Sequence, residues 1–111
     1  MPSDESIEKS EPHYDLCAVK AAFANGEYRF TGRVDQHLRL KGWTDADVID
    51  VIFGLACGDF HKSQAHRQRP NAWLDIYRPR RSSGRLYVKF TEGHEGTGFV
   101  VMSFCRDGDA H

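Results

Sequence analysis

The sequence predicts an α+β fold in which helices pack on one face of an antiparallel β-sheet. In the first half of the chain, apolar residues recur at helical spacing between capping residues and glycines. In the second half the pattern changes to a period of two, and turn residues separate short extended segments. Helices followed by a run of strands are typical of this fold class, and 111 residues are close to the common size of one domain.

Two helices are expected in the N-terminal third of the chain. Asp15 can cap the first, which runs to about Asn25, and Gly26 supplies the left-handed conformation that ends it. The second helix covers residues 33–41 and is closed by Gly42.

A third helix begins at Thr44 and is the best marked of the three. Asp45 and Asp47 occupy its first turn, where carboxylates interact favourably with the helix dipole. The residues that follow are strongly apolar, so we expect this helix to be buried and to end at Gly58.

Extended segments dominate the rest of the chain. They are expected at residues 28–32, as a connector or short strand, and at residues 59–63, 72–77, 85–91 and 99–104. A polar loop is expected at residues 64–71, and turns at residues 80–84 and 93–98. The alternation is cleanest in residues 85–91, where one side is apolar and the polar side carries Arg85, Tyr87, Lys89 and Thr91.

Both ends of the chain are expected to be tails around a single domain. Residues 1–11 are polar and acidic and should be disordered, the domain covers residues 12–106, and residues 107–111 form a second tail. The sequence contains no apolar run of membrane-spanning length and no signal-like N-terminus, so we expect a cytoplasmic protein with no membrane partner. The three cysteines are then expected to be reduced.

Positive charge is concentrated in residues 61–90, here called the basic segment. It carries eight of the 15 Lys and Arg residues and a single acid, Asp75, whereas the whole chain has a net charge of −1. Aromatic residues lie among these cations, a mixture that suits phosphate contact and base stacking. The segment therefore indicates either a surface for a polyanion or an ordinary solvated basic face.

The polar side of residues 85–91 is the sharpest chemical pattern. Tyr87 lies between Arg85 and Lys89, and a phenol between two cations can act as acid or base in phosphoryl transfer while the cations stabilise the developing charge. The competing interpretation is an exposed strand with solubilising charges. Lys62 and His61, just after the third helix, could reach a phosphate, and His61 or His66 could move a proton near neutral pH.

No metal or cofactor site is expected. Cys57 and His61 have a C-x₃-H spacing, but the chain has no paired C-x-x-C or H-x-x-x-H motif, and structural zinc usually takes four ligands. The glycines of residues 93–98 join two strands and do not open a helix, unlike a nucleotide-binding loop.

Three sequence words in this region resemble the MqsR family of bacterial toxins. They are DFHKS (residues 59–63), WLDIYRP (residues 73–79) and GRLYVK (residues 84–89), and the family carries DFYKS, WQDVYRP and G-x-VYLK in the same order. The resemblance extends over about residues 12–105 and implies the RelE/ParE-like toxin fold. It also implies a metal-independent mRNA endoribonuclease that is neutralised by a cognate antitoxin encoded nearby.

The resemblance transfers the functional side chains of the family only in part. Lys62 and Tyr87 match the lysine and tyrosine of the family words, whereas His61 stands in place of a tyrosine, Leu74 in place of a glutamine and Cys105 in place of a lysine. The implied catalytic residues are thus Lys62, Tyr87 and His61, with RNA contacts from Arg85, Lys89, Arg78, Arg80 and Arg106.

The implied reaction is attack of the RNA 2′-OH on the adjacent phosphate. The alternative is a module of the same fold that binds RNA or the antitoxin and has lost catalysis. A DNA-binding regulator is disfavoured, because the best-marked helix is acidic and apolar and lacks the Arg, Lys, Asn and Gln of a recognition helix.

Overall fold

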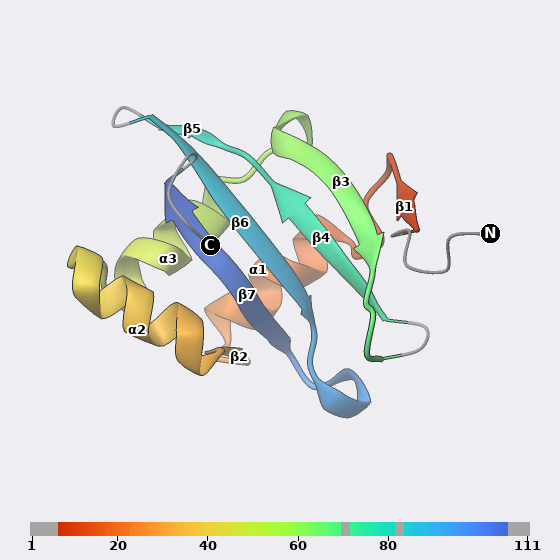
Figure 1. The fold of residues 1–111 in the computed structure, drawn as a ribbon, viewed down its shortest axis with the longest axis horizontal. Helices are drawn as coiled ribbons and strands as arrows, with labels where there is room; N and C mark the ends of the chain where they lie inside the picture. Colours follow the sequence, from red (N-terminus) through yellow and green to blue (C-terminus); the bar gives the residue numbers. More distant parts are fainter. Residues whose placement is uncertain (1–6, 70–71, 82–83, 107–111) are drawn as a thin grey trace.

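The computed structural model describes residues 7–69, 72–81 and 84–106, and within them it confirms the α+β class (Figure 1). The α-helices are α1 (Leu16–Ala24), α2 (Gly32–Lys41) and α3 (Asp45–Phe53). The strands are β1 (Glu8–Lys9), β2 (Tyr28–Phe30), β3 (Phe60–Ala65), β4 (Trp73–Tyr77), β5 (Arg80–Arg81), β6 (Gly84–Glu92) and β7 (Phe99–Arg106). Their order in the sheet is β1-β3-β4-β6-β7-β2, and β5 pairs with β6. Neighbouring strands are antiparallel except β2 and β7, which are parallel.

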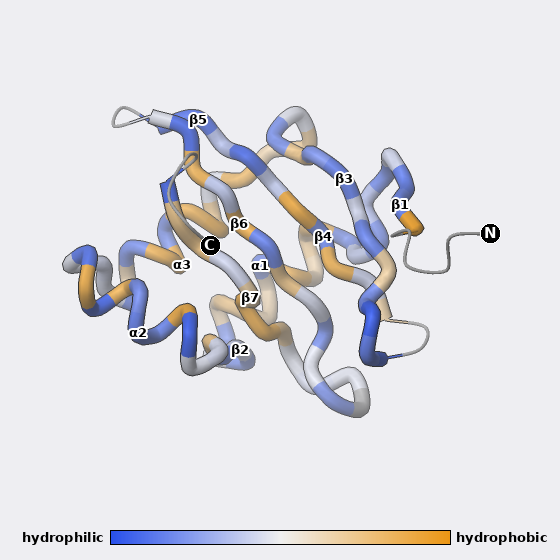
Figure 2. Tube along the Cα trace, in the orientation of Figure 1, coloured by the Kyte–Doolittle hydropathy of each residue, from blue (hydrophilic) through white to orange (hydrophobic). Residues whose placement is uncertain are grey.

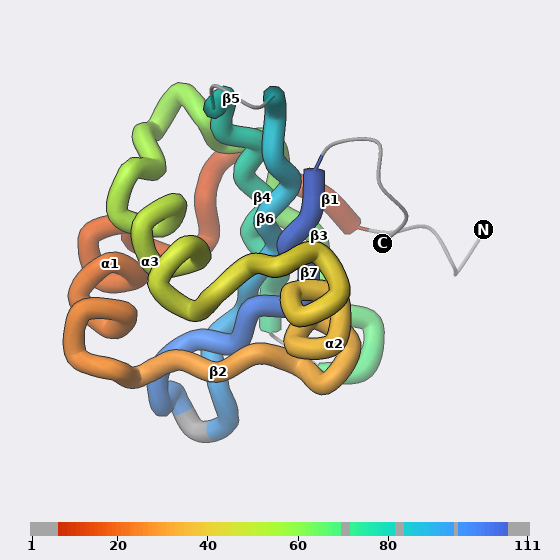
Figure 3. Tube along the Cα trace, turned by 90° about the vertical axis from the view of Figure 1, so that its left-hand side faces the viewer, coloured from red at the N-terminus to blue at the C-terminus, as the bar shows by residue number. Residues whose placement is uncertain are grey.

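The hydrophobic core lies between the helices and one face of the sheet. The helices α1 and α3 lie side by side on this face, and α2 runs along β7 (Figure 3). Val19, Val48 and Ile52 from the helices and Val88 and Phe90 from β6 are completely buried there. By contrast, β3 is hydrophilic over most of its length (Figure 2), so the sheet becomes more polar towards its β1 edge.

The helices begin and end largely where the sequence predicts. Thr44 accepts a hydrogen bond from the Asp47 N–H, and the Asp47 carboxylate accepts one from the Thr44 N–H, so the two residues form a capping box for α3. Gly42 ends α2 with a φ of 77°, a conformation that other residues rarely adopt.

The predicted extension of α3 to Gly58 is wrong. The helix ends at Phe53, and residues 57–59 form a separate 3-10 turn. The carbonyl groups at this end are taken by side chains from elsewhere: Lys20 donates to Phe53 and Leu55, and Arg81 donates to Val51. Cations at a helix C-terminus satisfy its last carbonyls, so these contacts stabilise the early end, which falls at Gly54.

Two predictions of irregular structure also need correction. Residues 1–11 were expected to be disordered, but Glu8 and Lys9 form β1 on the edge of β3; residues 1–6, like the predicted tail 107–111, lie outside the described residues. The predicted polar loop 64–71 begins later, because β3 continues to Ala65. Backbone pairing to a neighbour fixes both segments, although their composition is polar.

Candidate functional site

The pairing of four strands defines the side of the sheet that faces away from the core, here called the outer face. Lys62 of β3 is opposite Ile76 of β4, Ile76 is opposite Lys89 of β6, and Lys89 is opposite Ser103 of β7. Residues opposite each other in a sheet point to the same side, so this row crosses one face. Alternation along the strands adds Gln64, Leu74, Arg85, Tyr87 and Cys105 to it.

A β-bulge at His61 turns Lys62 to the outer face. Phe60 is opposite the core residue Tyr77, whereas Lys62 is opposite Ile76, so the register shifts between them. Without the extra residue, Phe60 and Lys62 would point to the same side. Bulges commonly re-aim a side chain in this way, and here His61 is the exposed residue at the bulge.

A second bulge lies in β7 at Met102. Val101 is opposite Phe90 on the core side, and Ser103 is opposite Lys89 on the outer face. The change of side places Cys105 opposite Tyr87, and the Cys105 side chain is 1% exposed. The two bulges together bring side chains of β3, β6 and β7 onto one face.

Lys62 and Tyr87 therefore share a face and are separated by β4. Their strands are two spacings apart, about 10 Å. Lys89 is in the same cross-strand row as Lys62, with Ile76 between them, and it is two residues from Tyr87 along β6. Burial lowers the pKa of Lys89, and the charge of Lys62 lowers it further. Two ammonium groups that repel each other on a half-buried surface favour the binding of an anion.

Lys62 also has an acidic partner from the N-terminal strand. Its Nζ lies 2.8 Å from a carboxylate oxygen of Glu8, and Gln64 Nε2 donates to the same oxygen at 3.2 Å. These hydrogen bonds lower the pKa of Glu8. A shallow groove between β1 and β3 is lined by this pair together with Lys9, Ser10 and His61.

The other predicted RNA-binding residues are not all on the outer face. Arg85 is on the same side as Tyr87, and Arg80 of β5 is directly opposite Arg85. Arg78 follows Ile76 by two residues and donates its backbone N–H to Asp59. Arg106 is opposite Leu86, a buried core residue, so its strand position faces away from Tyr87. The prediction that Arg106 joins this surface is not supported by the register.

The aromatic residues of the basic segment are mostly structural. Tyr77 and Phe90 stack on each other in the core, and burial raises the pKa of Tyr77. The ring of Trp73 stacks on His13, and the ammonium of Lys9 lies 4.2 Å from its centre. Among these four aromatic residues, Tyr87 alone points to the outer face, so of the four only this ring is placed for the base stacking that the sequence suggests.

Asp75 does not neutralise the outer face, because it is buried on the core side. Its carboxylate accepts hydrogen bonds from Ser63 Oγ at 2.6 Å and from the backbone N–H groups of His13 and Tyr14. The carboxylate thus holds the residues before α1 against the sheet.

His66, the second histidine that the sequence offers for proton transfer, lies close enough to Lys89 to be affected by its charge. It directly follows the end of β3 at Ala65, and its Nδ1 accepts a hydrogen bond from the backbone N–H of Gln68. Burial lowers the pKa of His66, and the charges of Arg69 and Lys89 act in the same direction. The imidazole is therefore held mainly neutral near pH 7.

No group of three or more His, Cys, Asp and Glu side chains suited to a metal ion occurs in the described part of the chain. None of its helices is long and apolar enough to cross a membrane.

Comparison with known proteins identifies a family and a relative. The family model described as "Motility quorum-sensing regulator, toxin of MqsA" matches residues 11–106. The chain is also similar to the mRNA interferase toxin MqsR of Escherichia coli (strain K12), with 34% identity over 98 residues, which span 88% of this chain and 97% of that protein.

Proposed function

The chain belongs to the MqsR toxin family, and from this we propose that it is the toxin of a type II toxin–antitoxin system and cleaves mRNA. The observation that carries the proposal is the outer face. Lys62, Lys89 and Tyr87 come from two strands and lie on one side of the sheet, while the acid of the basic segment lies on the other side. Phosphate groups of RNA are the polyanion that such a surface suits.

The proposed reaction needs only proton transfer and charge stabilisation. The RNA 2′-oxygen attacks the adjacent phosphorus and loses its proton, the bond from phosphorus to the 5′-oxygen breaks, and that oxygen is protonated. The products are a 2′,3′-cyclic phosphate and a 5′-hydroxyl. Tyr87 is the proposed acid or base, and Lys62, Arg85 and Lys89 stabilise the charge on the phosphorane.

The remaining basic residues have supporting roles in this proposal. His61 is exposed beside Lys62 and is the auxiliary proton-transfer group. Arg78 and Arg80 extend the cationic surface beyond Arg85 and contact the RNA backbone. Arg81 and Arg69 are not included, because each donates to a backbone carbonyl, Arg81 to Val51 and Arg69 to Glu92.

Two departures from the family words fall on the outer face. Leu74 occupies the position of the family glutamine, but Gln64 is directly opposite it on the neighbouring strand. Opposite residues have Cβ atoms only about 5 Å apart, so an amide is still available in this part of the site. Cys105, in place of the family lysine, is buried opposite Tyr87, and Lys89 and Arg85 flank Tyr87 along β6.

The proposal includes two macromolecular partners. The substrate is mRNA, and the neutralising partner is a cognate antitoxin encoded nearby. The description of the matched family as a toxin of MqsA supports the antitoxin.

Cleavage by the purified protein in EDTA tests the function. A defined RNA should be cut to fragments that end in a cyclic phosphate, and chelation should leave the rate unchanged. Binding without cleavage would favour the alternative, a catalytically degenerate module of the same fold. Cleavage that EDTA abolishes would reject the metal-independent mechanism.

A further inference from the structure

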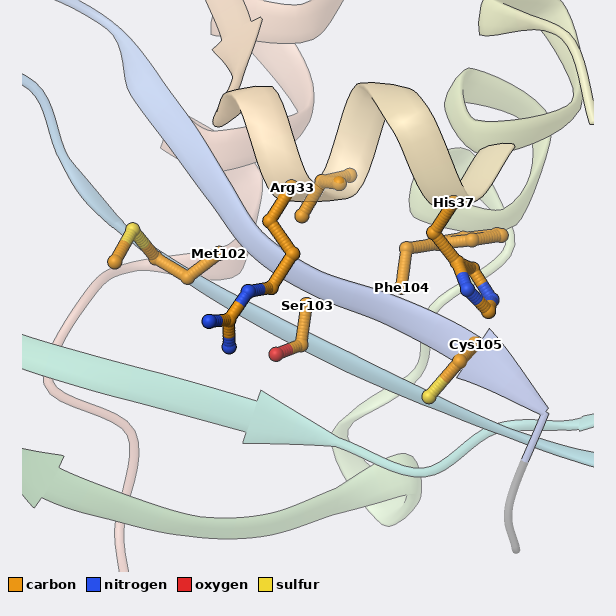
Figure 4. Close-up of a pocket in the computed structure, with 7 residues that line it drawn as sticks. Arg33, His37, Met102, Ser103, Phe104 and Cys105 are labelled. Carbon is orange, nitrogen blue, oxygen red and sulfur yellow. The ribbon is translucent and has the colours of Figure 1, made fainter. Parts of the chain in front are cut away.

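A small pocket lies between α2 and β7, beside the outer face (Figure 4). Its volume is about 70 Å³, several times the roughly 15 Å³ that one water molecule needs. Arg33 and His37 reach from α2 towards β7, where Ser103 and Cys105 line the opposite wall. A pocket of this size admits part of a nucleotide and no more.

The strand register places this pocket next to the proposed reaction centre. Cys105 in its wall is directly opposite Tyr87, and Ser103 is directly opposite Lys89. Opposite side chains in an antiparallel pair are neighbours, with Cβ atoms about 5 Å apart. An RNA whose phosphate lies at Tyr87 and Lys89 therefore brings an adjoining base to the mouth of the pocket.

The lining suits a base better than a phosphate. Val34, Met102 and Phe104 make much of the wall apolar, and polar groups are few. Ligand pockets commonly combine apolar walls with a small number of polar groups that fix orientation. A phosphate would gain nothing from the apolar surface, whereas the flat ring of an unstacked base would be desolvated by it.

His37 has a ring nitrogen that forms no hydrogen bond within the described structure. Its Nε2 atom is buried and has no hydrogen-bond partner among the described residues. Buried polar atoms in proteins are nearly always hydrogen-bonded, so a missing partner calls for an explanation. The edge of a base can both donate and accept hydrogen bonds and would satisfy the imidazole.

We propose that the pocket between α2 and β7 receives one unstacked base of the bound RNA, and that His37 reads the edge of that base. Arg33 is exposed at the mouth of the pocket, where its guanidinium can contact the phosphate of the same nucleotide. His37 is then a specificity-determining residue for the cleavage. This inference rests on the proposed function, because the RNA must lie across the outer face for its base to enter.

Sequencing of the cleavage sites in a random RNA pool tests the inference. The variant His37→Phe removes both ring nitrogens and keeps an aromatic ring, and His37→Gln restores a hydrogen-bonding amide. Gln36→Ala, at the adjacent exposed position of α2, is the matched control. We expect His37→Phe to reduce the preference for one base beside the cut at least tenfold, His37→Gln to retain part of it, and Gln36→Ala to retain all of it. Thermal unfolding checks that each variant is folded.

A second measurement separates failure of this inference from failure of the proposed function. The four nucleoside 3′-monophosphates are titrated into the full-length protein while the NMR signals of the His37 imidazole are followed. A cleaving wild type whose preference survives His37→Phe overturns the inference and leaves the function standing. A protein that does not cleave, but whose His37 signals shift with one nucleotide, supports the pocket and overturns the function. A protein that does not cleave RNA and whose His37 signals do not shift with any nucleotide overturns both the inference and the proposed function.

Discussion

The carboxylate of Glu8 lies 2.8 Å from the ammonium of Lys62 and occupies the place where an RNA phosphate would bind the proposed catalytic lysine. The strand that carries Glu8 has other attachments: Ala65 donates its N–H to the Ile7 carbonyl at 2.8 Å, and Lys9 lies over Trp73. Lys62 can therefore leave Glu8 without release of β1. When RNA binds, its phosphate would then replace the Glu8 carboxylate as the partner of Lys62.

The first prediction concerns this exchange. Glu8→Gln should increase RNA affinity about twofold to fivefold at low salt, because an exposed ion pair of this kind is weak. Glu11→Gln removes a neighbouring exposed negative charge and is the control. Fluorescence anisotropy with a 2′-O-methyl oligonucleotide measures both variants. An equal gain in the two would show that net charge alone is responsible.

The second prediction concerns the proposed reaction centre. Lys62→Ala and Tyr87→Phe should each relieve growth arrest on expression and reduce the cleavage rate by about 10²-fold or more, because they remove charge stabilisation and proton transfer. Lys41→Ala, on the exposed end of α2, should retain full toxicity. Circular dichroism establishes that the variants are folded. Full toxicity of both site variants would reject the assignment.

The third prediction follows from the lowered pKa of Lys89. Only the charged ammonium attracts phosphate, so RNA affinity should fall as pH rises through this pKa, which lies below the ordinary lysine value. Lys89→Arg should remove this fall, because a guanidinium stays charged to above about pH 12, whereas Lys62→Arg should not. Affinity for a 2′-O-methyl oligonucleotide, measured between neutral and alkaline pH, decides the matter.

The same shift has a defined sign for stability. The folded state holds the proton of Lys89 less tightly than the unfolded state, so between the two pKa values the unfolded state binds more protons. The free energy of unfolding should therefore rise with pH across that window. A fall in that window that Lys89→Arg abolishes would contradict the assigned direction.

The fourth prediction concerns the buried carboxylate of Asp75. Asp75→Ala should lower the free energy of unfolding by at least about 3 kcal/mol, because it leaves the Ser63 hydroxyl and the N–H groups of His13 and Tyr14 unpaired. Ser63→Ala, which removes one of these donors, should cost less. Urea denaturation measures both. A small effect of Asp75→Ala would show that another group anchors the segment before α1.

The α+β class, the three helix starts and the alternation of β6 were predictable because each depends on local patterns. Thr44 caps a helix through its own neighbours, and Leu86, Val88 and Phe90 alternate with polar residues along one strand. The early end of α3 was missed although Gly54 marks it, because a glycine inside an apolar run does not by itself end a helix. The side chains that take carbonyls there, Lys20 and Arg81, are distant in the sequence.

The candidate site was predictable in its residues but not in its geometry. Tyr87 and Lys89 share a face by simple alternation, whereas Lys62 reaches that face only through the bulge at His61. A bulge of one extra residue cannot be recognised from the alternation of apolar and polar residues in a segment as short as residues 59–63. Glu8 was assigned to a disordered tail because its composition is polar, and its contact with Lys62 depends on strand pairing. The pocket at His37 likewise depends on how α2 packs on β7.

The last prediction concerns Gln64 and Leu74, which face each other across β3 and β4. If the amide at this place contacts RNA, its strand of origin should matter little, because the two Cβ atoms are about 5 Å apart. Gln64→Leu should therefore lower kcat/KM about tenfold, the effect of losing one good hydrogen bond in a binding site. The double variant Gln64→Leu with Leu74→Gln should recover most of that loss.

Gln68→Leu, at an exposed position just after β3, controls for the loss of an amide near the site. Recovery in the double variant, together with no effect of Gln68→Leu, would show that the amide has moved to the neighbouring strand. A double variant as impaired as Gln64→Leu would show that Gln64 acts in another way, through the hydrogen bond that it donates to Glu8.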